Sequence, residues 1–357
     1  MNIDIYCTVI DNYGDAGVSL RLARELKRLG AKVRLCCDDL TVLRTIALPE
    51  DEDAALRFLP FDAPREVLAS PSASVVVAAF ACHLPTTAVQ LINAHHSIVL
   101  YLDYLSAEKW VEDFHGLPAP AEFARGFYFY PGFTAKTGGL LLEPQLKQQA
   151  KAALALPYFA SGSRQVTLFS YHNPQVLSLL KLLETSAIPT TFTVFAGKPL
   201  ANINTLLGLH LQVGESYQSG KLCFKAQGMV SQAQYDDFLC RADLNLVRGE
   251  DSIVRALCVG KPCLWQIYPQ SDDIHIGKLQ ALLTCFKRAL GENYVPALTR
   301  LEHLMLAYNG HGSWELTNFD AWEQTWQKIA QAMQNYIFSL PNLAESMLFF
   351  CQQKQEK

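Results

Sequence analysis

IDIYCTVI (residues 3–10), DNYGDAG (11–17) and KVRLCC (32–37) are the three stretches that decide the fold of this chain. The first is a β-branched, apolar run, which predicts a buried strand. From Val18 to Leu29 the apolar residues recur at helical spacing with basic residues between them, which predicts a helix. The third stretch predicts a second strand. The chain therefore opens with a βαβ unit, whose crossover is expected to be right-handed and to join parallel strands.

The same alternation of strands and helices continues in two series along the chain. We expect further strands of the first series at 73–80 and 97–102, followed by an irregular, aromatic-rich region at 103–143 that is typical of recognition loops. The second series is predicted from strands at 165–170, 191–195, 221–225, 243–247 and 262–267 and from helices at 174–184, 231–241 and 252–258.

These two series predict an α/β protein with two Rossmann-like domains facing a central cleft. We expect an N-terminal domain at 1–150 and a C-terminal domain at 151–334, joined by a linker within the Pro- and Ser/Gly-containing stretch 144–163. The tail from about 320 has a helical stripe of Trp322, Trp326, Ile329 and Met333. A C-terminal helix at about 335–357 is expected to pack back on the first domain.

Composition excludes several classes of protein. Of 357 residues, 50% are hydrophobic and 18% are charged, which excludes a disordered chain, and 30 basic against 34 acidic residues give a net charge of −4. This balance argues against nucleic-acid binding. The longest apolar run, 73–82, is too short to cross a membrane, and the N-terminus has no basic signal region. We therefore expect a cytoplasmic protein without membrane attachment.

Metal-binding motifs are absent from the sequence. The ten cysteines are scattered without a Cys-x-x-Cys pair and are interpreted as buried free thiols of a reducing compartment. The histidines show no His-x-x-x-His spacing; His275 could approach a diphosphate, but a loop histidine without a role is the plainer interpretation. The only Asp-x-Asp, at 51–53, is distant from any predicted strand end and is interpreted as a solvated surface.

Asp11 and Asp15 bracket the turn between the first strand and the first helix. Ligands of open parallel sheets bind at the carboxyl ends of the strands, so both carboxylates are expected near a ligand. Two acids disfavour a phosphate here and favour a cationic group or acid–base chemistry. The alternative is that Asp11 only ends the strand and Asp15 only caps the helix.

Arg248-Gly249-Glu250-Asp251-Ser252 (RGEDS) follows a predicted strand of the second domain in the same way. Asp251 or Ser252 would cap the next helix, whose N–H groups would face a diphosphate together with Arg248. Glu250 could accept hydrogen bonds from sugar hydroxyls. A capped helix with a surface Arg–Glu pair is the alternative, and both remain open on the pentapeptide alone.

Phe169 and Tyr171 lie in LFSYHN (168–173), at the end of another predicted strand, and point to one side by two-residue alternation. Two aromatic rings on one side can sandwich a planar base. Core packing is the alternative and is strongest for Phe169.

The three motifs together resemble one family, the elongation factor P arginine rhamnosyltransferases called EarP. The matching stretches run from residue 3 to about 280: residues 3–27, YLSAEKW (104–110) with HGLP (115–118), PGFTAKTGGLLLE (131–143), LFSYHN, DLNLVRGEDSIVRA (243–256) and GKPCLWQIYPQ (260–270). The resemblance implies the GT-B glycosyltransferase architecture. Met229 stands where that family is expected to have a phenylalanine near the base.

The resemblance also implies an activity and its residues. The enzyme would invert the sugar linkage while moving L-rhamnose from dTDP-β-L-rhamnose to an arginine of elongation factor P, which activates that factor for rescue of ribosomes stalled at polyproline. Asp15 would be the general base and Asp11 its companion. The donor would be held by Phe169, Tyr171, Gln232, Arg248, Gly249, Glu250, Asp251 and Ser252. The resemblance also implies that no metal or cofactor is needed.

Two other functions remain open from the sequence. One is a GT-B transferase with another acceptor, such as a lipid or a small sugar. The other is a non-catalytic protein that binds a nucleotide or a translation factor, which would not need the paired acids Asp11 and Asp15.

Overall fold

The computed structural model describes residues 1–10, 13–119, 123–270 and 273–355 and divides into two compact units. Unit 1 comprises Met1–Glu143 and Leu340–Lys357, and unit 2 comprises Pro144–Ser339. The chain changes units after Glu143, whereas the predicted boundary was after residue 150. The expected linker is wrong in its first part, because helix α6 (Pro144–Leu154) begins at Pro144 and packs on helices α9 (Gln232–Arg241) and α10 (Gly249–Val259).

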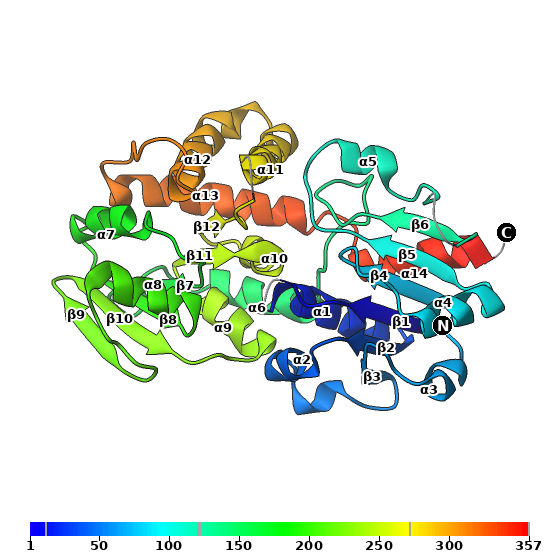
Figure 1. The fold of residues 1–357 in the computed structure, drawn as a ribbon. Helices are drawn as coiled ribbons and strands as arrows, with labels where there is room; N and C mark the ends of the chain where they lie inside the picture. Colours follow the sequence, from blue (N-terminus) through cyan, green and yellow to red (C-terminus); the bar gives the residue numbers. More distant parts are fainter. Residues whose placement is uncertain (11–12, 120–122, 271–272, 356–357) are drawn as a thin grey trace. The chain divides into compact units, whose positions relative to one another are not determined.

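Unit 1 is built on a sheet of six parallel strands in the order β3-β2-β1-β4-β5-β6. Its strands and helices alternate along the chain (Figure 1). The elements are β1 (Asn2–Cys7), α1 (Gly14–Arg28), β2 (Lys32–Cys37), α2 (Leu40–Ile46), η1 (Pro49–Asp51), β3 (Leu56–Pro60), α3 (Arg65–Ala69), β4 (Val75–Ala79), α4 (Thr86–His95), β5 (Ile98–Leu102), α5 (Trp110–Phe114) and β6 (Gly126–Phe129), with the C-terminal helix α14 (Leu343–Gln355). The predicted parallel βαβ start is confirmed.

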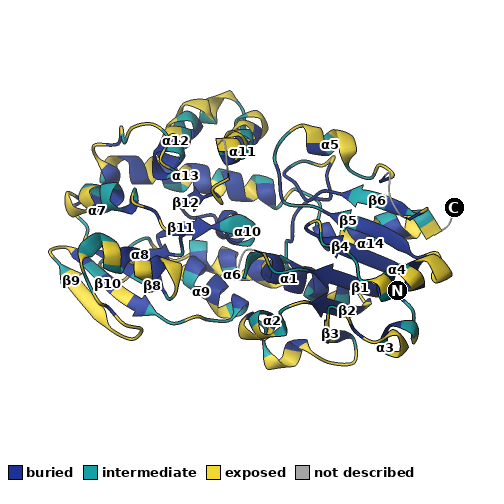
Figure 2. Cartoon of the chain, in the orientation of Figure 1, coloured by how far each residue is buried: buried dark blue, intermediate teal, exposed yellow. Residues whose placement is uncertain are grey.

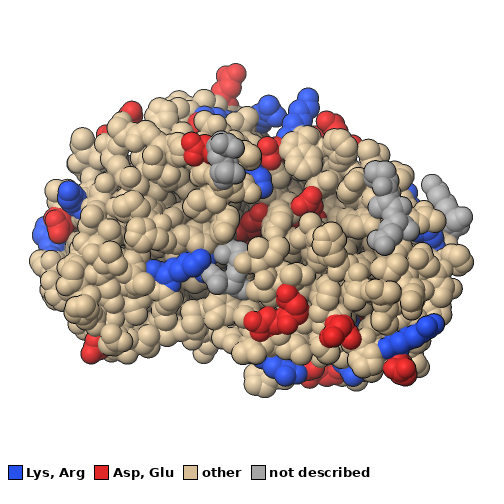
Figure 3. Space-filling view, viewed as in Figure 1, with Lys and Arg blue, Asp and Glu red and all other residues tan. Residues whose placement is uncertain are grey.

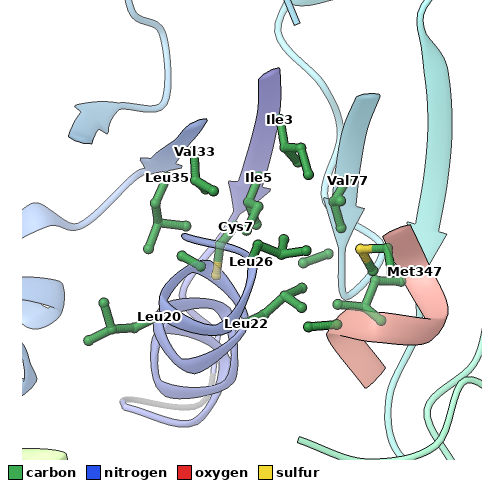
Figure 4. Packing of buried hydrophobic residues seen from close by; sticks show 14 of the residues in the cluster. Ile3, Ile5, Cys7, Leu20, Leu22, Leu26, Val33, Leu35, Val77 and Met347 are labelled. Atoms are coloured by element: carbon green, nitrogen blue, oxygen red, sulfur yellow. The ribbon is translucent and has the colours of Figure 1, made fainter. Parts of the chain in front are cut away.

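One hydrophobic cluster of the unit 1 core lies between helix α1 and one face of the sheet, and a second cluster includes Tyr6, Val76 and Ile92. Figure 4 shows side chains of β1, β2 and β4 meeting Leu20, Leu22 and Leu26 of α1. Fully burying a Leu or Ile side chain contributes about 1.5–3 kcal/mol, so this face fixes α1 against the end of β1. Met347 of α14 completes the same cluster, which shows how the C-terminal helix belongs to unit 1.

Strand β1 ends at Cys7, three residues before the predicted end at residue 10. The reason lies in the backbone hydrogen bonds of the next residues. The Val9 N–H donates to Asp38 Oδ1 at 2.9 Å, and the Ile10 N–H donates to Asp15 Oδ2 at 2.8 Å. Because these N–H groups bind carboxylates, they do not continue the strand, and the apolar run therefore predicted too long a strand.

The C-terminal segment 335–357 was expected to form one helix. In the structure it contains the end of α13 and a separate helix, α14. Helix α13 ends at Ile337 and α14 starts at Leu343, after Pro341. The Leu140 N–H donates to the Pro341 carbonyl at 3.1 Å, and the Leu343 N–H donates to the Leu140 carbonyl at 2.8 Å. Gly139 has φ +78°, and a Cβ there would lie 1.9 Å from the Pro341 oxygen, so only glycine permits this close approach.

Unit 2 has a second six-stranded sheet, in the order β12-β11-β7-β8-β10-β9, with only β9 antiparallel. Its helices lie around this sheet (Figure 1). Besides α6, α9 and α10, the elements are β7 (Arg164–Leu168), α7 (Val176–Glu184), β8 (Thr190–Phe195), α8 (Lys198–Leu207), β9 (Ser216–Ser219), β10 (Leu222–Gln227), β11 (Leu244–Arg248), β12 (Cys263–Gln266), α11 (Ile274–Leu290), η3 (Glu292–Tyr294), α12 (Val295–Tyr308) and α13 (Phe319–Ile337).

Burial follows the sheets. In Figure 2 the central strands of both units are dark blue, while β9 and most of α5 are yellow. The region 103–143, expected to be irregular, contains α5 and β6, so that expectation is wrong in part. Within the described residues, every helix is too short or too polar to span a bilayer.

Candidate active site

The carboxyl edge of the unit 1 sheet carries Asp15. It is the second residue of α1, whose N-cap is Tyr13, and only 3% of it is exposed. Its Oδ2 accepts a hydrogen bond from the Ile10 N–H, so this carboxylate links the start of α1 to the segment that follows β1. The first turn of a helix is favourable for a negative charge. Asp11, the predicted companion, lies outside the described residues.

Further acids follow neighbouring strands at the same edge. Asp38 comes directly after β2, and Asp103 comes directly after β5. Asp38 is exposed and Asp103 is half-buried, and the Tyr104 N–H donates to Asp103 at 2.7 Å. Parallel strands end at one edge, so unit 1 presents several carboxylates there, which suits a cationic ligand.

The corresponding edge of unit 2 is formed by β11 and α10, which follow each other without an intervening loop. Arg248 is both the last strand residue and the helix N-cap, and Gly249 makes the turn with φ +67°. The predicted cap at Asp251 or Ser252 is wrong: α10 starts at Gly249, three residues before the expected start at 252, because a glycine allows the strand to turn directly into a helix. Glu250 and Asp251 lie in the first turn.

The Arg248 guanidinium contacts the rings of both predicted aromatic residues, Phe169 and Tyr171. Its Cζ lies 4.7 Å from the Phe169 ring centroid and 4.4 Å from the Tyr171 ring centroid. Arg248 is 7% exposed and Tyr171 5%, and such desolvation strengthens cation–π contacts. Strand β7 ends at Leu168, yet both rings face one guanidinium. The structure therefore brings Phe169, Tyr171 and Arg248 into one cluster, with the guanidinium against both rings.

Two residues of β12 position this cluster through hydrogen bonds, and neither was predicted from the sequence. Gln266 Oε1 accepts the Tyr171 N–H at 2.8 Å, and its Nε2 donates to the His172 carbonyl at 3.2 Å. Trp265 Nε1 donates to the Gly249 carbonyl at 2.9 Å. The roles of a Gln and a Trp inside an apolar strand depend on register, which a single sequence does not give.

The remaining predicted donor residues lie around the same edge. Gln232 is the first residue of α9 and is 7% exposed, and Tyr235, one helical turn further, packs against Phe169 at 5.3 Å between centroids. Ser252 is buried in the first turns of α10. Met229 precedes α9 and is 38% exposed. The second-domain candidates thus all come from the strand ends β7 and β11 and the helix starts α9 and α10.

Among the described residues, one group of side chains could offer metal ligands. Asp273, His275 and His311 can offer three ligand atoms within 4.8 Å of one another. However, His275 Nδ1 accepts the Gln270 N–H at 3.2 Å, and burial lowers the pKa of His275. A neutral imidazole with an accepting Nδ1 carries its proton on Nε2, which then donates hydrogen bonds and does not bind a metal. This cluster therefore does not fit a metal site.

The Asp-x-Asp at 51–53 does not fit a metal site either, although not for the expected reason. Asp51 is buried, not solvated, and its Oδ1 accepts a hydrogen bond from Arg24 Nε at 2.7 Å. Asp53 pairs with Lys27 at 2.9 Å. Both acids are used to hold the loop before β3 against α1.

Two Rossmann-like α/β units, each with polar side chains at the carboxyl edge of a parallel sheet, define a GT-B glycosyltransferase fold. MurG of Acinetobacter baumannii shares it, with a TM-score of 0.54 over 99% of both chains at 11% identity. The family model "Elongation-Factor P (EF-P) rhamnosyltransferase EarP" matches residues 3–352. This chain belongs to the EarP family and is an enzyme of the protein-arginine rhamnosyltransferase type.

Curated relatives and a solved structure support this membership. The protein-arginine rhamnosyltransferase of Pseudomonas putida is 36% identical, with 97% of both chains covered. That of Neisseria meningitidis is 31% identical, with 99% of this chain and 97% of the relative covered. A solved structure described as the basis for EarP-mediated arginine glycosylation of translation elongation factor EF-P has a TM-score of 0.64 at 29% identity, with 99% of both chains covered. The predicted family, fold and enzyme class are confirmed.

Proposed function

We propose that this enzyme transfers L-rhamnose from dTDP-β-L-rhamnose to one arginine side chain of elongation factor P. The family match along residues 3–352 carries the proposal. The chemistry of the two sheet edges supports it: acids at the edge of unit 1 suit a guanidinium, and an arginine beside aromatic rings in unit 2 suits a nucleoside diphosphate. A non-catalytic nucleotide-binding protein is not retained, because the curated relatives are enzymes.

Unit 1 would hold the acceptor. A guanidinium is a poor nucleophile because it is charged and its lone pairs are delocalised, with a pKa of about 12.5–13.8 in water. Carboxylates match its planar fork of donors and can orient one terminal nitrogen. Asp15 would take the proton from that nitrogen, with Asp11 as its companion. The Ile10 N–H donates to Asp15 Oδ2, which fixes the side chain of the proposed base at the start of α1.

Unit 2 would hold the donor. The N–H groups at the start of α10 and the Arg248 guanidinium would receive the diphosphate, since a helix N-terminus and an arginine both favour anions. Tyr171 would stack on the thymine, supported by Phe169 and Gln232. Glu250 and Asp251 would accept hydrogen bonds from sugar hydroxyls, and the Ser252 hydroxyl would donate one to the phosphate. Because Arg248 lies against both rings here, we propose that it leaves the Tyr171 ring when the diphosphate binds.

The chemical step is a single displacement. The arginine nitrogen attacks the anomeric carbon from the face opposite the diphosphate, a C–N bond forms, and the C–O bond to the diphosphate breaks. The proton passes to Asp15, the electron pair of the broken bond goes to dTDP, and inversion yields α-rhamnosyl-arginine. General-base assistance of this kind contributes about 10²–10⁴ in rate. We propose that Arg248 and the helix N–H groups replace a metal, and that the reaction uses no cofactor.

The setting we propose is the cytoplasm, where rhamnosylation would activate elongation factor P for rescue of ribosomes stalled at polyproline. We do not expect nucleic acid or membranes to be partners. In the view of Figure 3, the Lys and Arg side chains of the described residues lie in separate small groups and not in one continuous basic surface. The net charge of −4 agrees with this expectation.

Intact-mass measurement of elongation factor P after incubation with the enzyme and dTDP-rhamnose tests the proposal. The expected result is one added deoxyhexose, located on an arginine by fragmentation. Omission of the enzyme and replacement of the acceptor arginine by lysine are the controls. An unmodified factor, together with sugar transfer to a lipid or a small sugar, would replace this proposal by the alternative acceptor.

A further inference from the structure

An apolar ridge stands out on the surface of unit 1. It consists of Trp110, Phe114 and Leu117, which are 43%, 47% and 47% exposed. Trp110 and Phe114 lie four residues apart on α5, so they share one face of the helix, with their rings 6.2 Å apart in an edge-to-face arrangement. In Figure 2 most of α5 is yellow. Exposed aromatic clusters of this kind mark interaction surfaces, and Trp is a frequent anchor there.

The ridge is held rigidly on the sheet. The Trp110 ring packs edge-on against Tyr130 at 5.3 Å, and the Tyr128 N–H donates to the Leu117 carbonyl at 3.0 Å. The Tyr130 N–H donates to His115 Nδ1 at 3.0 Å, and burial lowers the pKa of His115 to about 4, so this histidine is a neutral acceptor at physiological pH. A preformed surface binds with a smaller loss of conformational freedom.

The ridge lies at the same sheet edge as Asp15. Helix α5 follows the carboxyl end of β5, and its anchor Tyr130 follows the carboxyl end of β6. In the strand order, β6 is three places from β1, which corresponds to about 14 Å at the usual strand spacing. A standard protein interface covers about 800 Å² per partner and is roughly 30 Å across. One partner can therefore place an arginine at Asp15 and also cover the ridge.

The charge around the ridge favours a cationic partner. Residues 103–115 contain four acids, Asp103, Glu108, Glu112 and Asp113, and one lysine. Lys136 lies 3.7 Å from Glu112, which still leaves a balance of −2 for these acids and both lysines. A loop that presents an arginine is attracted by such an edge, which speeds and orients the encounter.

We propose that Trp110, Phe114 and Leu117 form the docking surface for the folded protein that carries the acceptor arginine. The inference rests on the proposed function. The ridge would bind an apolar area of that protein next to its cationic loop, while the loop reaches Asp15. This surface would explain how one arginine among many is selected. Arginine residues of other proteins could reach Asp15, but those proteins would lack the apolar area that binds the ridge.

Kinetics with elongation factor P as acceptor test this proposal. For the double variant Trp110→Ala/Phe114→Ala we expect KM for the factor to rise at least tenfold, with kcat and the Kd for dTDP-rhamnose changed less than twofold. Phe349→Ala is the matched control, because Phe349 is an aromatic residue of unit 1 that is 63% exposed on α14. It should leave KM unchanged. Leu117→Lys provides a second variant that keeps the Trp110–Tyr130 packing and should also raise KM.

Four outcomes would overturn the inference. Unchanged KM in both variants would mean that the factor docks elsewhere, and a loss of kcat together with donor binding would mean that the ridge only supports the fold. Light scattering that shows a dimer of the parent, dissociated by the substitutions, would assign the ridge to a second copy of this chain. Absence of product with the parent enzyme would overturn the proposed function and this inference with it. An active parent with unchanged variants would overturn the docking surface alone.

Discussion

The connection from strand to helix differs between the two sheet edges. In unit 1, residues 8–13 separate β1 from α1, and in unit 2 no residue separates β11 from α10. The longer connection leaves N–H groups of Val9 and Ile10 that bind the carboxylates of Asp38 and Asp15. The direct junction requires the positive φ of Gly249 and turns Arg248 onto two aromatic rings.

Under the proposed function, this difference would let one architecture serve a cationic acceptor and an anionic donor. The backbone N–H groups of the longer connection bind carboxylates, which suit a cationic acceptor, while the direct junction places Arg248 at the start of α10, which suits an anionic donor. The fold alone does not decide the chemistry, because both edges belong to Rossmann-like sheets. The side chains at the junctions do, and substitutions at each junction should therefore have separable effects.

The largest effect is expected from Asp15→Asn. The amide keeps an oxygen that accepts the Ile10 N–H, so the connection stays closed, but it cannot take a proton. We expect turnover to fall by about 10²–10⁴, the usual contribution of a general base. The Kd for dTDP-rhamnose, measured by calorimetry, should stay within twofold of that of the parent.

Asp38→Asn is the matched control at the same edge, because it keeps an acceptor for the Val9 N–H and should retain most of the activity. Equal losses in both variants would mean that the edge acts through its charge as a whole. Loss of donor binding in Asp15→Asn would contradict the separation of the two edges.

The next effect is expected from Arg248→Ala in unit 2. Removing a charged donor that stabilises a leaving group costs about 10²–10³ in kcat, and the affinity for dTDP should fall as well. Arg248→Lys keeps the charge but loses the planar contact with the rings, so an intermediate loss is expected. Steady-state kinetics and calorimetry with dTDP measure both quantities.

Lys198→Ala provides the comparison for Arg248, since Lys198 Nζ lies 5.3 Å from the Tyr171 centroid and also offers a positive charge. A larger loss in Lys198→Ala than in Arg248→Ala would move the diphosphate away from α10.

The sequence predicted those parts of the fold that depend on local periodicity. The apolar stretches of β1, β2, β4 and β5 and the helical spacing of α1 are visible because each buries one face against a common core. Strand β9 (SYQS) was missed because it is an exposed edge strand without apolar alternation. Strand β6 was missed because its aromatic residues lie among loop residues of similar composition.

The site was predictable in its residue types but not in its contacts. RGEDS after one predicted strand and two aromatic residues at the end of another predicted a ligand-binding edge, and the structure brings Arg248, Phe169 and Tyr171 together. The contact joins residues far apart in the chain, so no local pattern indicates that the guanidinium covers the rings. Gln266 was missed for the same reason, since its hydrogen bond to Tyr171 depends on tertiary packing.

A smaller effect is expected from Tyr171→Ala. A stack of a base on an aromatic ring contributes about 1–3 kcal/mol, so dTDP and dTDP-rhamnose should both bind roughly ten- to a hundredfold more weakly. Tyr171→Phe keeps the ring and should bind nearly as the parent does. Calorimetry with both ligands gives the answer.

Tyr268→Ala is the control for Tyr171, because Tyr268 is 50% exposed and meets the Tyr171 ring edge-on at 5.4 Å. If Tyr171→Ala binds dTDP as tightly as the parent, then Tyr171 is a packing residue for Arg248 and the base lies elsewhere in unit 2.

The smallest effect is expected from removal of metal ions: saturating EDTA should leave the rate unchanged. The departing diphosphate gains negative charge, which many transferases offset with a divalent cation, but under our proposal Arg248 and the N–H groups of α10 would offset it. Of the described residues, Asp273, His275 and His311 come nearest to a ligand set, and the Gln270 N–H already occupies Nδ1 of His275. The measurement is the initial rate before and after EDTA treatment, with Mg²⁺ or Mn²⁺ added back. A rate that falls with EDTA and returns only with a divalent ion would show that the charge at the junction of β11 and α10 is insufficient, and it would remove the main difference proposed between the two sheet edges.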